Sequence, residues 1–194
     1  LWHSSAASDV YKRQVFTFGR FNPPTIGHEK LIKAVAKEAG SDDWFIIPSQ
    51  SQKKKTDPLP YDIKTKYMKM MFPWAASHID DKACCNTIIK VGAHLMMKEY
   101  TDIVMVVGSD RVADFDKLLQ KYNRTDDYSF STIVVKSAGE RDPDAEGATG
   151  MSASKMREAA SNKKTRDFMA GIPDTLTVNQ KLELMQEVRK GMGL

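Results

Sequence analysis

Short apolar runs alternate along the chain with longer segments in which apolar residues recur every three or four positions. The short runs contain few polar positions, which is typical of strands that are buried on both faces of a parallel sheet. They predict strands at residues 15–18, 44–48, 103–107 and 132–135, with a weaker candidate near residues 77–80.

The longer segments have the spacing of amphipathic helices. Apolar residues recur through residues 31–39 with charged residues opposite, and Gly40 stands where a helix would stop. Further helices are predicted at residues 61–72, 86–100, 111–122, 154–160 and 178–190, and no strand is evident after residue 137. The order predicts an α/β fold: a Rossmann-like parallel sheet with helices on both faces and a C-terminal helical tail.

The length of 194 residues and the hydrophobic content of 41% fit a single domain, which we assign to residues 15–194. Residues 1–14 show no periodicity and resemble a leader found on unrelated assembled sequences. We therefore leave them out of the fold, as a non-native or disordered leader in which a read-through artefact replaces the natural start. The acidic loop at residues 140–147 is interpreted as solvated.

The composition bears on the expected partners and cellular location of the protein. The longest apolar run is far shorter than the roughly 20 residues of a membrane helix, so no membrane partner is expected. Cys84 and Cys85 are adjacent and cannot form a disulfide framework, which favours a reducing, cytoplasmic location. The net charge of +4 is spread along the chain and favours anionic ligands without requiring nucleic acid.

The most informative segment follows the first predicted strand and runs Gly-Arg-Phe-Asn-Pro-Pro-Thr-Ile-Gly-His at residues 19–28. In an open parallel sheet, ligands bind beyond the carboxyl ends of the strands, near helix N-termini. Gly19 allows close approach of the backbone to a ligand, and His28 at the start of a helix can donate a hydrogen bond to a phosphate oxygen. The spacing alone fits a tight turn with a helix cap equally well.

A second candidate phosphate site lies near the C-terminal end, in Met-Ser-Ala-Ser-Lys-Met-Arg at residues 151–157. Ser154 is predicted to be the N-cap of a helix. Together with Ser152, the open amides of the first turn and Arg157, it could hold β- and γ-phosphates. Without other information, an ordinary cap with a solvated arginine is the commoner interpretation of such a segment.

Both segments resemble, in order, the two signatures of the HxGH-type nucleotidyltransferase superfamily. Its members include cytidylyltransferases, nicotinamide mononucleotide adenylyltransferases and phosphopantetheine adenylyltransferase. The resemblance spans most of residues 15–173 and implies that Gly19, Arg20, Phe21, His28, Ser152, Ser154 and Arg157 bind nucleotide or substrate. Thr25 stands at the position of the first histidine of the motif, where it could donate to a phosphate but cannot carry positive charge.

The resemblance implies further residues of the site. Gly108 and Asp110 follow the third predicted strand, where adenylyltransferases of this superfamily hold nucleotide or acceptor, although Asp110 could equally cap the next helix. In relatives a lysine after the second strand neutralises phosphate in the transition state, and Lys54 or Lys55 is the matching residue here. Lys64 and Lys66 stand near where many adenylyltransferases have an arginine.

The implied reaction is in-line attack by a small phosphorylated acceptor on the α-phosphorus of a nucleoside triphosphate, with Mg²⁺ held through the phosphates. His28, Lys54 or Lys55, and Arg157 are the expected catalytic residues, ATP is favoured over CTP, and a homo-oligomer is compatible with the sequence. A dinucleotide-binding oxidoreductase is disfavoured because no strand is followed by Gly-x-Gly-x-x-Gly. The alternative is a non-catalytic nucleotide- or nucleic-acid-binding module on the same fold.

Overall fold

The computed structural model describes residues 11–80, 82–139 and 151–194. Its sheet has four parallel strands in the order β2-β1-β3-β4, formed by β1 (Arg13–Gly19), β2 (Asp43–Pro48), β3 (Asp102–Val107) and β4 (Thr132–Ser137). The chain proceeds outward from β1 to β2 and then returns to the other side of β1. The switch point of the topology therefore lies between β1 and β3, where such sheets open a crevice for ligands.

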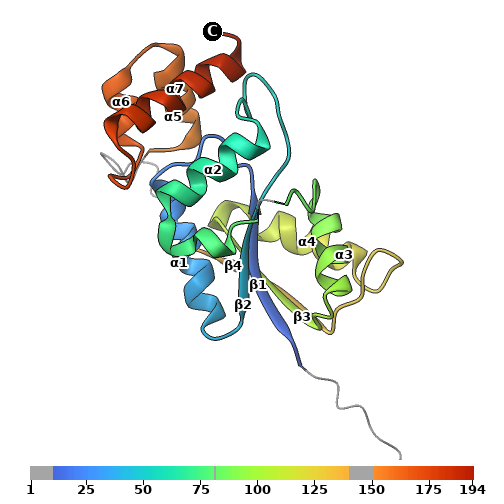
Figure 1. Ribbon diagram of the computed structural model, residues 1–194. Helices are drawn as coiled ribbons and strands as arrows, with labels where there is room; N and C mark the ends of the chain where they lie inside the picture. The colour runs from blue at the N-terminus through green and yellow to red at the C-terminus, as the bar shows by residue number, and fades with distance from the viewer. Residues whose placement is uncertain (1–10, 81, 140–150) are drawn as a thin grey trace, which may run out of the picture.

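Helices cover both faces of the sheet (Figure 1). α1 (Gly27–Ala39) and α2 (Tyr61–Met71) lie on one side, and α3 (Ile88–Met97) and α4 (Val112–Tyr122) lie on the other. Consecutive residues of β1 pack in two different hydrophobic clusters. Val15 belongs to the cluster that contains Ile32 and Val35, whereas Phe16 belongs to the cluster that contains Val91. The expected Rossmann-like α/β architecture is confirmed.

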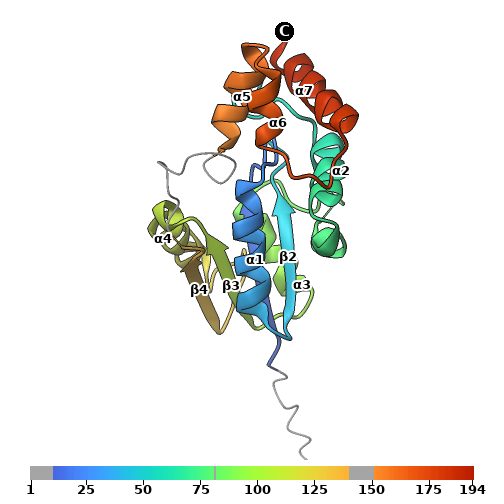
Figure 2. The same cartoon turned by 90° about the vertical axis from the view of Figure 1, so that its left-hand side faces the viewer.

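Three C-terminal helices lie beyond the carboxyl ends of the strands (Figure 2): α5 (Ala153–Ser161), α6 (Thr165–Ala170) and α7 (Val178–Met192). α7 starts with a capping box between Thr177 and Gln180. Buried residues of all three helices join the same core as α2. The short helix α6 was not expected from the sequence, because six residues give too little periodicity to recognise.

The first strand begins two residues earlier than predicted. Arg13 and Gln14, which the sequence analysis left outside the fold, are part of β1, and Gln14 is fully buried. Arg13 is fixed by ion pairs with Glu38 and with Asp42, the latter at 2.8 Å. Residues 1–10 lie outside the described part of the chain, so both the origin of the leader and the single-domain assignment stay predictions.

The prediction of a weak strand near residues 77–80 was wrong. A 3₁₀ helix occupies Pro73–His78, and only a single parallel bridge between Ile46 and Ile79 extends the sheet among the described residues.

The predicted ends of the helices differ from the observed ends by up to three residues, and the difference is largest for α3. The acidic loop at residues 140–147 falls outside the described residues. None of the helices in the described ranges is long and apolar enough to cross a membrane.

Gly92 allows α3 to approach a buried aromatic ring. A Cβ atom at this position would lie 2.6 Å from Cδ1 of Tyr128, which is itself fully buried and donates a hydrogen bond of 2.8 Å to the carbonyl of Leu119. We expect Gly92→Ala to lower the free energy of unfolding by about 1–2 kcal/mol, because overpacking outweighs the helix propensity of alanine. Urea denaturation measures this, and an unchanged or higher stability would contradict the close contact.

Candidate active site

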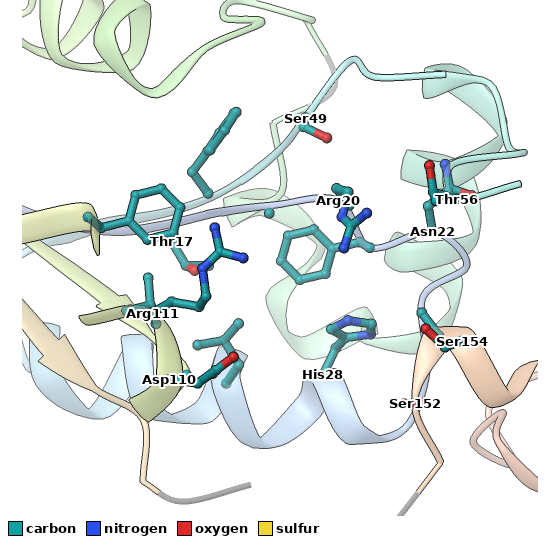
Figure 3. Close-up of a pocket in the computed structure, with 18 of the residues that line it drawn as sticks. Thr17, Arg20, Asn22, His28, Ser49, Thr56, Asp110, Arg111, Ser152 and Ser154 are labelled. Carbon is teal, nitrogen blue, oxygen red and sulfur yellow. The ribbon is translucent and has the colours of Figure 1, made fainter. Parts of the chain in front are cut away.

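A cavity of about 610 Å³ opens at the carboxyl end of the sheet, at the switch point between β1 and β3. Figure 3 shows that Asp110 and Arg111 approach it from the end of β3, that Ser152 and Ser154 approach from the start of α5, and that Arg20 and His28 lie between them. The walls are shared by four segments far apart in the sequence and include Thr17, Phe18, Gly19, Arg20, Phe21, Asn22, His28, Ser49, Thr56, Gly108, Asp110, Arg111, Phe115, Ser152, Ser154 and Arg157.

The loop after β1 is tied to three other parts of the chain. The side chain of Asn22 donates to the carbonyl of Leu59 at 3.0 Å and accepts from its amide at 2.9 Å. The amide of Ile26 donates to the carbonyl of Gly171 at 2.8 Å, and the carbonyl of Gly19 accepts from the amide of Ser49 at 2.7 Å. These long-range bonds hold a loop that lacks regular structure, as a preorganised binding loop requires.

His28 is oriented by the residue that replaces the first histidine of the motif. Nδ1 of His28 accepts from the amide of Thr25 at 2.9 Å and lies 3.1 Å from its hydroxyl oxygen. Because Nδ1 accepts a hydrogen bond, the neutral ring carries its proton on Nε2. The ring of His28 also packs on that of Phe21, with centroids 4.9 Å apart.

Thr25 does not have the position that the sequence analysis expected. It is buried, with 1% of its surface exposed, and it does not line the cavity. Its amide and hydroxyl are directed to His28, so in this structure Thr25 orients the histidine ring. The helix start makes this arrangement possible, because residues three apart lie on the same face of a helical turn.

The second segment brings an arginine against the first loop. Nη1 of Arg157 donates to the carbonyl of Asn22 at 2.7 Å, and Nη2 donates to Oγ of Ser154 at 3.0 Å. Ser152, not Ser154, is the N-cap of α5, because its hydroxyl accepts from the amide of Lys155. The predicted cap was therefore wrong by two residues, and Ser154 positions the guanidinium of Arg157. Burial and the neighbouring Arg20 lower the pKa of Arg157 below its ordinary value, and Asp57 opposes this.

The end of β3 contributes a carboxylate and a further cation. Gly108 and Asp110 line the cavity, and a Cβ atom on Gly108 would lie only 2.8 Å from Oδ1 of Asp110. The N-cap of the following helix α4 is Arg111, without a side-chain hydrogen bond, so Asp110 does not cap it. Arg111 also lines the cavity, and its guanidinium lies 5.3 Å from the ring centroid of Phe115. Arg111 was not predicted from the sequence, although its place after a strand could have indicated it.

The lysines after β2 do not line the cavity. Lys53, Lys54 and Lys55 are exposed on a turn that is closed by hydrogen bonds between Lys53 and Asp57. Lys54 and Lys55 therefore do not occupy the cavity wall, which on this side is formed by Ser49 and Thr56. The neighbouring Lys64 is fully buried and donates to the carbonyl of Ser49, a contact that the sequence pattern did not indicate.

The buried ammonium of Lys64 predicts a pH dependence of stability. Burial lowers the pKa of Lys64 to about 8, and Asp57 partly opposes this shift. Between pH 8 and the ordinary lysine pKa, the unfolded chain therefore binds more protons than the folded chain, so this group makes the protein more stable as pH rises. We expect the difference in unfolding free energy between the wild type and Lys64→Met to rise by roughly 2–3 kcal/mol from pH 7.5 to 10. A flat difference would show that Lys64 titrates normally.

Comparison with known proteins gives a consistent assignment. A family model described as cytidylyltransferase-like matches residues 16–159. A probable nicotinate-nucleotide adenylyltransferase of Acholeplasma laidlawii is 26% identical over 136 residues, which cover 62% of this chain and 72% of that protein. A solved structure from Vibrio parahaemolyticus, with a similarly provisional description as a nicotinate-nucleotide adenylyltransferase, shares the fold with a TM-score of 0.54 at 17% identity. The alignment covers 90% of this chain and 99% of the other.

The fold and the two ordered loops at one cavity define a nucleotidyltransferase. The chain belongs to the cytidylyltransferase-like family.

Proposed function

We propose that the protein is an adenylyltransferase that transfers AMP from ATP to a mononucleotide, with nicotinate mononucleotide as the first candidate acceptor, and releases pyrophosphate. The observation that carries the proposal is that a single cavity is lined by His28, by Ser154 and Arg157 of the second segment, and by Asp110 after β3. The name of the A. laidlawii relative supports the choice of acceptor. The volume is in the range of small-molecule sites.

The chemistry requires one bond to form and one to break. An acceptor phosphate oxygen attacks the α-phosphorus in line, and the bond from that phosphorus to the bridging oxygen of the β-phosphate breaks, so the electron pair leaves with pyrophosphate. Nε2–H of His28 donates to the transferring phosphoryl group. The start of α5, with Ser152, Ser154 and Arg157, holds the departing phosphates through charge-assisted hydrogen bonds.

Arg20 takes the role that was expected for a lysine. It lines the cavity and is within reach of the same ligand as Arg157, whereas Lys54 and Lys55 contribute positive charge from outside the wall. Arg20 therefore neutralises charge on the reacting phosphates, and positioning with electrostatics supplies most of the rate enhancement.

The residues of this site fit a Mg²⁺ ion that binds together with the nucleotide and is coordinated mainly by its phosphates. Among the described residues that line the cavity, Asp110 is the single carboxylate, and the described residues contain no group of three or more His, Cys, Asp or Glu side chains that could hold a metal ion. Mg²⁺ would therefore be held mainly by phosphate oxygens, with Asp110 as the available protein ligand. When bound, it would neutralise the charge that develops on the phosphates.

A substrate panel tests the proposal. ATP and CTP are each combined with nicotinate mononucleotide, nicotinamide mononucleotide, phosphopantetheine, glycerol phosphate and flavin mononucleotide, and pyrophosphate release is measured together with the mass of the product. The expected result is the dinucleotide from ATP and nicotinate mononucleotide. Absence of pyrophosphate from every pair, together with salt-dependent binding of oligonucleotides, would favour the non-catalytic alternative.

A further inference from the structure

A buried carboxylate lies directly behind the phosphate-binding end of the cavity. Asp57 is 2% exposed and does not line the cavity. Its backbone closes the lysine turn through two bonds with Lys53, of 2.8 and 2.9 Å, and its Oδ2 accepts from the hydroxyl of Thr56 at 3.2 Å. Oδ1 is buried and accepts no hydrogen bond within the part of the chain that the structure describes. An arrangement of this kind is costly and calls for a reason.

The charge of this carboxylate acts on three cations. Nε of Arg20 lies 3.7 Å from Oδ1 of Asp57, too far for a hydrogen bond but within the distance of an ion pair. The charge of Asp57 also acts on Arg157, whose other charged neighbour is Arg20, and on the buried Lys64. Arg20 and Arg157 would repel each other without it. Asp57 is thus the buried anion that offsets the repulsion between Arg20 and Arg157 before any phosphate is bound.

We propose that Asp57 is a positioning residue for the phosphate-binding end of the cavity, which holds Arg20 beside Arg157 in the empty site and weakens the binding of pyrophosphate to them. The inference rests on the proposed function in one respect, because it takes this end of the cavity as the pyrophosphate site. The inference also explains how the product could leave the site. The fixed negative charge of Asp57 competes with pyrophosphate for the guanidinium groups of Arg20 and Arg157, which favours release of pyrophosphate.

The sign of the effect distinguishes this role from ordinary structural support. Removing the carboxylate leaves the cation cluster with one more positive charge, so an anion should bind more tightly while the empty protein becomes less stable. A residue that only supported the fold would lower stability and leave affinity unchanged or weakened. At an effective dielectric constant near 20, one charge a few ångströms behind the ligand changes anion affinity by roughly tenfold after screening by salt.

The experiment measures the binding of inorganic pyrophosphate by titration calorimetry, with Mg²⁺ and again in EDTA, to the full chain and to Asp57→Asn. We expect Kd to fall roughly tenfold in the variant, and Tm without ligand to be lower than that of the wild type. Asp62→Asn is the matched control, because Asp62 is an exposed aspartate on the first turn of α2. It should change Kd by less than about twofold.

Lys64→Met is a second variant, which should change the Kd of pyrophosphate in the opposite direction. It replaces Asp57→Asn in the test if that variant does not fold. Without the buried ammonium, the charge of Asp57 acts more strongly on Arg20, so pyrophosphate should bind several-fold more weakly. Unchanged or weaker binding in Asp57→Asn, or unchanged or tighter binding in Lys64→Met, would overturn the inference alone. A wild-type protein that binds no pyrophosphate under either condition would overturn the proposed function as well, which separates the two failures.

Discussion

Replacement of His28 by alanine is expected to lower kcat by about 10²–10³-fold, which is the usual cost of removing one preorganised donor to a transition-state oxygen. The side chain lines the cavity and its Nδ1 accepts from the amide of Thr25, so the neutral ring carries its proton on Nε2, which is the donor in the proposed mechanism. The variant removes that donor and also the side-chain acceptor of the Thr25 amide. Steady-state kinetics with saturating ATP and acceptor measures the loss, and single-turnover experiments show whether it lies in the chemical step.

The matched control for this variant is His78→Ala. His78 stacks on Trp44 with ring centroids 3.7 Å apart and lies outside the cavity wall. Its loss should lower stability through packing but leave kcat within about twofold. His28→Ala should instead lower kcat, and it should also lower the unfolding free energy by about 1–3 kcal/mol, because the buried amide of Thr25 loses its acceptor. Unchanged turnover in His28→Ala would remove the central role assigned to it.

Replacement of Arg157 by glutamine is expected to raise KM for ATP by about 10–100-fold, because charge-assisted hydrogen bonds to phosphate contribute about 1.5–3 kcal/mol. The substitution also releases the carbonyl of Asn22, which the guanidinium holds at 2.7 Å, so the first loop should become less well ordered. Fluorescence titration with ATP measures affinity independently of turnover.

Two companion variants separate charge from geometry at this position. Arg157→Lys retains the charge but cannot bond to the carbonyl of Asn22 and the hydroxyl of Ser154 in the same fork, so it should recover only part of the affinity. Arg166→Gln removes an exposed arginine of α6 and should leave KM unchanged. Normal ATP affinity in Arg157→Gln would contradict the phosphate-binding role of this residue.

The parts of the fold that could be predicted from the sequence are those in which burial follows a local pattern. β3 is buried throughout and consists of an uninterrupted apolar run after its first residue, so its identity as a central parallel strand was clear. The start of β1 was not, because Gln14 is a polar residue that is buried. Its side-chain amide donates to the carbonyls of Val15 and Asp43 at 2.9 and 2.7 Å. Such hydrogen bonds allow a polar residue to be buried, and a pattern of apolar positions cannot predict them.

The same distinction holds at the candidate site. Motifs located the loop after β1 and the start of α5, but not what each side chain does there. Thr25 had been expected to contact phosphate and instead orients His28, while Asn22 makes its bonds to Leu59 across 37 positions of sequence. Lys64 is a charged residue type that is normally exposed, but it lies on the buried face of α2 with Tyr67 and Met68. Long-range hydrogen bonds and buried charges depend on partners that no local window contains.

The contact between Arg157 and the carbonyl of Asn22 joins residues 135 positions apart and links α5 to the loop after β1. The C-terminal helices are therefore as much a part of the binding site as the sheet. Docking of these helices preforms the site, and a ligand that bridges both sides favours the docked arrangement to the same extent, since coupling free energies are reciprocal. Under the proposed function, a nucleotide bound to both sides would hold the C-terminal helices to the loop after β1, and the stability of this docking would rise with the ATP concentration.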